Sequence, residues 1–91
     1  MNYKVKNAIR NAVSKLMVVA LDLKAPYTLS VEVHGRFGAI WVAVFDGQEA
    51  IAMPDTIGTM FSIKLPKTID EIGLFSDVVN ATIDIIKAEI K

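Results

Sequence analysis

Residues 27–45 contain two neighbouring segments with different patterns of apolar and polar side chains. In residues 27–34 the two kinds alternate at every position, whereas residues 38–45, GAIWVAVF, contain no polar side chain. Strict alternation predicts a β-strand with one face on a core and the other in water. A strand that is apolar on both faces needs cover on both sides. The second side of that strand therefore needs a covering element, either a helix of this chain or another molecule.

Residues 3–23 carry apolar side chains on one arc of a helical wheel and basic or polar side chains on most of the rest. This pattern predicts an amphipathic helix packed on a core. The Ala-Pro pair that follows ends the helix, because the residue before a proline is disfavoured in the α region. Met17, Val18 and Leu21 lie on the side that is polar earlier in the helix, so its last turns are expected to need cover all round.

A second helix is predicted over residues 69–90, where Thr68 and Glu71 form a capping box at its start. One apolar stripe is expected to face the core and consists of Ile72, Phe75, Val79, Ile83, Ile86 and Ile90. A second stripe lies beside it and consists of Leu74, Val78, Ala81 and Ile85. Together they span about 200° of the helix, more than the ~100° or so of an ordinary surface helix. The second stripe is therefore either wedged between the sheet and the first helix or a seam between two copies.

Two glycine-containing turns set the expected strand pairing. Gly35-Arg36 fits a two-residue turn, and Asp46-Gly47 is the strongest short hairpin signal in the chain. The resulting register pairs Val33 with Gly38, Val31 with Ile40, Leu29 with Val42, Val44 with Glu49, Val42 with Ile51 and Ile40 with Met53. The expected core face is Leu29, Val31, Ile40, Val42, Ile51 and Met53. The opposite face carries Phe37, Trp41 and Phe45 among small alanines. A loop one residue longer at Gly35 would exchange the two faces of the second strand.

These elements predict an α+β fold with two layers, in the order α-β-β-β-(β)-α. An antiparallel meander sheet of three to four strands, the fourth over residues 60–65, is flanked by an N-terminal and a C-terminal helix. The chain of 91 residues forms a single domain, 1–91. Its hydrophobic share of 53% and mean hydropathy of +0.42 are high for this size, which favours self-association or a protein partner.

The net charge is zero, but residues 1–45 carry +4 and residues 46–91 carry −4. The chain is thus expected to have either a basic and an acidic side or ordinary solvated faces. No apolar run approaches the ~20 residues that span a bilayer, and no export signal is read, so the expected location is cytoplasmic, away from membranes. Many isoleucines and lysines with only two arginines suggest a bacterial or phage source.

Few residues here are suited to chemistry. There is no cysteine, no glycine-rich phosphate loop and no acidic cluster at a metal-binding spacing, and His34 is the only histidine. Because His34 lies beside a predicted turn, with no nucleophile nominated within reach, it is interpreted as a turn residue rather than a catalytic base. We therefore expect no enzyme, with no catalytic residue, metal or cofactor.

No family is recognised. The order helix, three or four antiparallel strands, helix resembles that of the double-stranded RNA-binding domain. That family has a basic cluster at the start of its last helix, whereas residues 68–76 here read TIDEIGLFS. The resemblance is limited to the order of elements, and this acidic and apolar segment argues against binding of double-stranded RNA.

Two functions remain as hypotheses. The preferred one is a small non-enzymatic interaction or assembly protein that forms homodimers or larger assemblies. Its expected contact residues are Leu74, Val78, Ala81, Ile85, Phe37, Trp41 and Phe45. The alternative is a single-stranded nucleic-acid-binding module that stacks bases on Phe37, Trp41 and Phe45, with Arg36 and first-helix lysines at the phosphates. Nucleic acid is disfavoured as a partner because the net charge is zero and phosphate neutralisation dominates such affinity.

Overall fold

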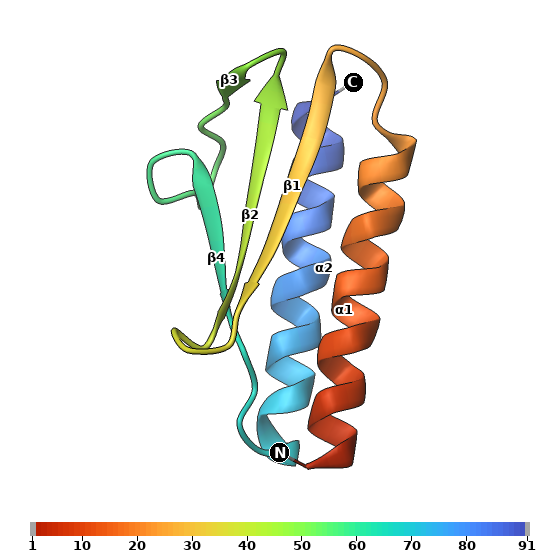
Figure 1. Cartoon of the computed structure of the whole chain (residues 1–91), viewed down its shortest axis with the longest axis vertical. Helices are drawn as coiled ribbons and strands as arrows, with labels where there is room; N and C mark the ends of the chain where they lie inside the picture. The colour runs from red at the N-terminus through yellow and green to blue at the C-terminus, as the bar shows by residue number, and fades with distance from the viewer. Residues whose placement is uncertain (1, 91) are drawn as a thin grey trace.

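The computed structural model describes residues 2–90 and contains a sheet between two terminal helices. The elements are α1 (Tyr3–Asp22), β1 (Tyr27–His34), β2 (Ala39–Asp46), β3 (Glu49–Ala50), β4 (Met60–Lys64), a 3-10 turn (Ile69–Glu71) and α2 (Ile72–Glu89). This confirms the predicted α+β class and the α-β-β-β-β-α order (Figure 1). The predicted bounds of the first strand, residues 27–34, are also those of the structure.

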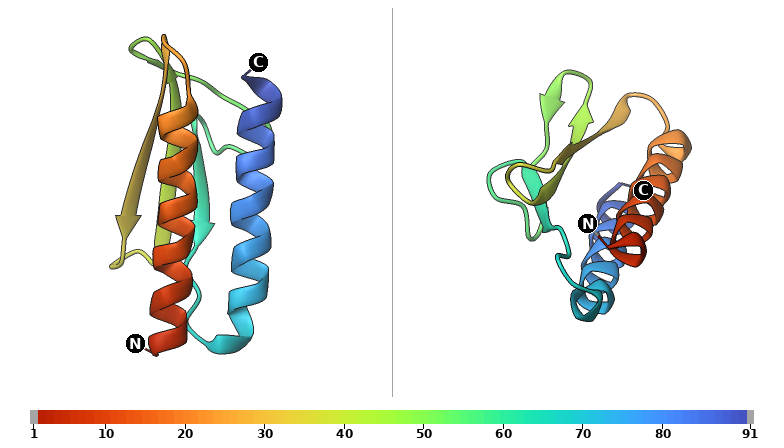
Figure 2. Two further views of the ribbon diagram at one scale, coloured as in Figure 1. Left: turned by 90° about the vertical axis from the view of Figure 1, so that its right-hand side faces the viewer. Right: turned by 60° about the horizontal axis from the view of Figure 1, so that its bottom comes forward.

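The two helices lie side by side on one face of the sheet (Figures 1 and 2). Helix α1 contacts β1, α2 contacts β4, and the two helices contact each other. Within residues 2–90, no helix covers the other face of the sheet. We call the helix-covered face the inner face and the opposite one the outer face.

Strand β2 is the centre of the sheet. Strand β1 pairs with one of its edges, and the short β3 and the longer β4 share the other, all antiparallel to β2. Ile40 lies opposite Ile63 of β4, so the predicted pairing of Ile40 with Met53 is wrong. The chain leaves the sheet soon after β3, and β4 takes the place beside β2 that the predicted third strand would have filled.

The connection between β1 and β2 is longer than predicted. Val33 pairs with Ile40 and His34 with Ala39, which leaves a loop of four residues, 35–38, instead of the predicted turn at Gly35-Arg36. The backbone N–H of Phe37 donates to His34 O at 3.1 Å, and Gly38 has a φ of 64° that favours glycine. The register is shifted by two residues, so every side chain stays on its predicted face.

The second hairpin is shifted in the same way. Phe45 pairs with Ala50 and Asp46 with Glu49, so the central turn residues are Gly47 and Gln48, not the predicted Asp46-Gly47. Gly47 has the positive φ, 64°, that such a tight turn requires of its first central residue. Strand β3 continues the pairing only as far as Ile51, whose N–H donates to Val44 O at 2.9 Å.

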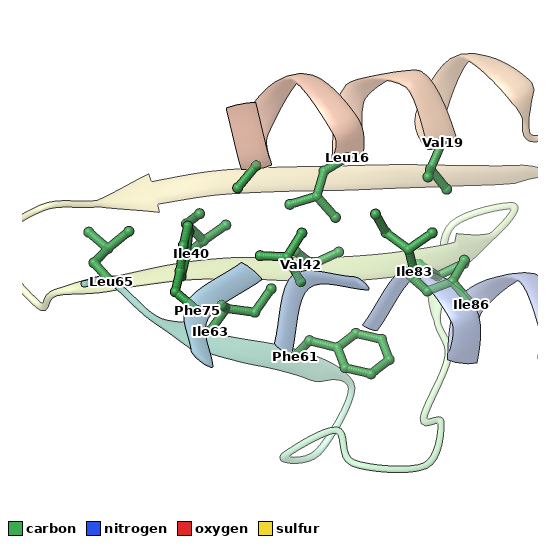
Figure 3. Close-up of a cluster of buried hydrophobic side chains, with 13 residues drawn as sticks. Leu16, Val19, Ile40, Val42, Phe61, Ile63, Leu65, Phe75, Ile83 and Ile86 are labelled. Carbon is green, nitrogen blue, oxygen red and sulfur yellow. The ribbon is translucent and has the colours of Figure 1, made fainter. Parts of the chain in front are cut away.

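The core lies between the inner face and the helices (Figure 3). The close-up shows side chains from α1, β2, β4, the residue after β4 and α2 meeting there, among them Leu16, Val19, Ile40, Val42, Phe61, Ile63, Leu65, Phe75, Ile83 and Ile86. The predicted core face is confirmed, because Ile40 and Val42 are fully buried and the other four predicted members pack against the cluster. Within the first stripe of α2, Phe75, Val79, Ile83 and Ile86 are buried as expected from the 3.6-residue period, while Ile72 and Ile90 at its ends are half-buried.

Candidate interaction surfaces

The outer face is apolar around β2 although no helix covers it. On this face Trp41 lies between Glu32 of β1 and Ser62 of β4. Ala39 and Ala43 flank it along β2 and are buried, while Trp41 itself is half-buried. Both alanines share this face with Trp41 and Phe45, because alternate residues of a strand point to the same side.

Three rings gather at one end of the outer face. The ring centroids of His34 and Trp41 are 3.9 Å apart, and Phe37 stacks on Trp41 at 5.7 Å. Glu32 Oε2 lies 2.7 Å from Nε2 of His34 and holds that imidazole in place. Phe37, carried by the four-residue loop, remains 70% exposed. The structure therefore brings together two of the three predicted aromatic residues and adds His34, which the sequence suggested only as a turn residue.

Phe45, the third predicted aromatic residue, lies four residues beyond Trp41 on β2. Its cross-strand neighbours are Thr28 and Ala50, and its side chain is half-buried. Four strand residues correspond to about 13 Å, so a base stacked on Phe37 would not reach Phe45. The predicted platform is thus divided between the two ends of β2.

A hollow of ≈ 410 Å³ opens beside Phe37 and is lined by three cationic side chains. Arg36 comes from the β1–β2 loop, Lys64 from the end of β4 and Lys67 from the segment that leads to α2. No acidic residue is among those that line the hollow. The sequence suggested Arg36 but neither lysine. The lysines come next to Arg36 only through the pairing of β4 with β2, which local sequence patterns do not predict.

The first-helix lysines do not join this basic cluster. Helix α1 packs on the inner face, against β1 and α2, whereas the rings and the hollow belong to the outer side of the sheet and its β1–β2 loop. The hollow thus does not combine Arg36 with first-helix lysines, which are not among the residues that line it. Lys64 could have been found from the sequence. It alternates with Phe61 and Ile63 in a predicted strand, so it is expected on the outward-facing side at the end of that strand.

Glu71 fixes the backbone that carries Lys67. Its carboxylate accepts hydrogen bonds from the backbone N–H of Lys67 at 2.7 Å and of Thr68 at 3.1 Å, the glutamate half of the predicted capping box. These two bonds are the largest causes that lower the pKa of Glu71, and the charges of Lys64 and Lys67 add to the effect. The backbone of Lys67 is thereby fixed beside the hollow that its side chain lines, while the nearby carboxylate offsets part of the positive charge.

The second apolar stripe of α2 lies on the flank of that helix away from α1. The flank that faces α1 carries Asn80, whose side chain accepts a hydrogen bond from Lys15 Nζ at 3.4 Å. On the opposite flank, Leu74 and Val78 border a shallow depression of ≈ 130 Å³ together with Lys64 of β4. The stripe is thus not wedged between the sheet and α1, as one of the two sequence interpretations held.

The stripe is exposed for most of its length. Leu74 is 71% exposed and Val78 38%, Ala81 is exposed, and Ile85 is half-buried against the core. Helix α1 has exposed apolar side chains as well, Met17, Val18 and Leu21, in the turns that the sequence predicted to need cover. Large exposed apolar side chains that lie together on a small protein are typical of a contact surface.

Within residues 2–90, no three acidic or histidine side chains are grouped so that they could hold a metal ion. Neither helix has the length and apolar character needed to cross a bilayer. No protein-family model matches the sequence, and comparisons with curated proteins and with solved structures find no significant match.

Proposed function

We propose that this protein is a small non-enzymatic interaction or assembly protein that associates with itself through the exposed stripe of α2. The observation that carries the proposal is the exposure of Leu74, Val78 and Ala81 along one flank of a helix whose other apolar stripe already fills the core. When a second copy covers these side chains, apolar surface of this chain of 91 residues leaves water, which lowers the free energy and favours association.

The spacing of the stripe suits a second helix. Its members at 74, 78, 81 and 85 follow each other at intervals of four, three and four residues, and the exposed Ala88 continues the series. This is the a/d spacing with which two helices pack along a common seam. Ala81 and Ala88 alternate with the larger side chains, which allows the two helices to approach closely. We infer a homodimer in which the two copies of α2 lie against each other.

A dimer of this kind leaves the outer face open. The stripe belongs to the helix layer, whereas Trp41 alternates along β2 with the inward-facing Ile40 and Val42, and Phe37 stacks on Trp41. The face that carries Phe37, Trp41 and Phe45 therefore takes no part in the proposed dimer and is free for a different contact. Self-association and binding on the outer face are separable properties, which makes each of them testable by itself.

The test is the mass of the protein in solution, measured by multi-angle light scattering at micromolar concentrations. We expect a dimer for the natural sequence and a monomer for Leu74→Asp and Ala81→Asp, because each places a charge in the seam. Both sites are exposed, so circular dichroism should show an unchanged fold.

The matched control is Leu21→Asp, which alters the exposed Leu21 of α1 and should remain dimeric. A monomeric natural protein would overturn the proposal. Dimers of Leu74→Asp together with a monomeric Leu21→Asp would place the contact on α1 instead.

A further inference from the structure

We infer that the hollow beside Phe37 binds single-stranded nucleic acid, with a base stacked on the Phe37 ring and adjacent phosphates held by Arg36, Lys64 and Lys67. This inference does not depend on the dimer proposed above. It rests on three features of the hollow, namely its charge, its exposed ring and its size.

The charge of the hollow is concentrated in a chain that has no net charge. Arg36, Lys64 and Lys67 come from three separate segments and line one depression with no acidic neighbour in its wall. Glu71 lies next to the two lysines and offsets part of their charge, but its carboxylate is bound to the backbone N–H groups of Lys67 and Thr68. The lysine ammonium groups remain available to an anion, and phosphate is an anion that both arginine and lysine bind in proteins.

The exposed ring narrows the choice of anion. Phe37 is held on Trp41 at a centroid distance of 5.7 Å, yet most of its surface is exposed. A braced aromatic side chain beside cations is how sequence-tolerant binders stack unpaired bases. In a duplex the bases are already stacked on each other, so the ring favours a single strand. Trp41 braces the ring rather than offering a second platform, because His34 and Phe37 both pack against it.

The size of the hollow agrees with one or two nucleotides. Its ≈ 410 Å³ lies within the roughly 300–1,000 Å³ of small-ligand sites. Three cations spread over the loop, the strand end and the following segment match successive phosphates of a strand better than the single phosphate of a mononucleotide. Ser62 also lines the hollow, and its hydroxyl adds a donor to the set.

The experiment titrates the protein with unlabelled octathymidylate and follows the fluorescence of Trp41, the single tryptophan. We expect saturable quenching at 50 mM salt. Three phosphate contacts give a slope of about −2 for log K against log salt, so affinity should fall about 15-fold between 50 and 200 mM salt. Phe37→Ala should weaken binding about tenfold or more, and Lys67→Gln should weaken it and make the salt slope shallower by about 0.7.

Matched controls separate the site from general electrostatic attraction. Lys6→Gln removes an exposed lysine of α1 on the other side of the molecule and should leave the affinity unchanged. Ala81→Asp should also bind normally, since Ala81 lies in the proposed dimer seam and is not among the residues that line the hollow. Phe37→Ala keeps Trp41, so its binding is measured by the same fluorescence and compared with its own unliganded signal. Circular dichroism checks that this variant is folded, so that lost binding is not mistaken for lost structure.

The competing ligands decide the identity of the partner. Thymidine monophosphate, inorganic phosphate and a duplex of the same length are titrated in parallel, and each should bind at least tenfold more weakly than the oligonucleotide. Equal affinity for the mononucleotide or for phosphate would overturn a nucleic-acid site in favour of a small anion. No quenching at 50 mM salt, or equal loss in Lys6→Gln and Lys67→Gln, would overturn the inference as a whole.

Discussion

The two faces of β2 are both apolar, but the structure treats them differently. On the inner face, Ile40, Val42 and Val44 are fully buried beneath α1 and α2. On the outer face, which no helix covers within residues 2–90, Ala39 and Ala43 are buried and Trp41 is half-buried. Burial of the small residues on the second side of this apolar strand therefore does not depend on a second layer of helices.

The two faces therefore contribute to different properties, the inner face to stability and the outer face to the proposed binding. Branched aliphatic side chains on the inner face interlock with those of the helices and fix the fold. On the outer side, the side chain of Phe37 is exposed enough to meet another molecule. The cationic hollow opens on that same side of the sheet, close to Phe37. Two changes test whether the two faces differ as described, and a third tests the carboxylate beside the lysines of the hollow.

The largest effect is expected from the inner face. Ile40→Ala removes a fully buried side chain and leaves a cavity, which should lower the free energy of unfolding by about 2–5 kcal/mol. Urea denaturation followed by circular dichroism measures the change. If the variant does not fold, Ile40→Val should show a loss of about 0.5–1.5 kcal/mol. A loss below these ranges in both variants would show that the inner face is not the packed one.

A smaller effect is expected from the outer face, although the side chain is larger. Trp41→Ala should cost about 1–2 kcal/mol, because the ring is only half-buried and water fills the space it leaves. In the natural protein, acrylamide should quench Trp41 readily. A loss as large as that of Ile40→Ala, growing with protein concentration, would mean that a second copy covers the outer face.

The smallest effect concerns Glu71, whose carboxylate accepts hydrogen bonds from the backbone N–H groups of Lys67 and Thr68 at the start of the last helix. Its pKa in the folded protein lies below its usual value, first because of the hydrogen bond from Lys67 N–H and then because of that from Thr68 N–H. A lowered folded-state pKa stabilises the protein above the unfolded pKa, and this contribution is lost as the pH falls through the folded-state value. Melting curves between pH 3 and 6 should therefore show a steeper fall for the natural protein than for Glu71→Gln. Parallel curves would refute the contribution.

Much of the local structure could be predicted from the sequence. The alternation in residues 27–34 reproduced β1, and the pairing of Thr68 with Glu71 located the start of the last helix. The inner and outer faces were assigned correctly even though both hairpin registers were wrong. Side chains alternate with a period of two, so a shift by two residues moves the pairs without moving any side chain to the other face.

The candidate sites could be predicted only in part. The second stripe of α2 followed from helical periodicity, and its exposure agrees with the sequence interpretation that a partner covers it. The cluster of Arg36 with Lys64 and Lys67 could not be found in this way, since no local pattern relates a loop residue to two lysines far along the chain. The choice of partner for each surface remains a proposal with its own test.

The sequence by itself determined which segments become helix or strand, which side of each is apolar and how the last helix begins, because these depend on neighbours a few residues apart. Tertiary structure decided the rest. It brought β4 rather than a long β3 to the edge of β2, placed both helices on one face, and gathered Arg36, Lys64 and Lys67 around one hollow. Such choices depend on how much apolar area each arrangement buries and on the entropy of closing the loops between distant segments, and neither quantity is written in a local pattern.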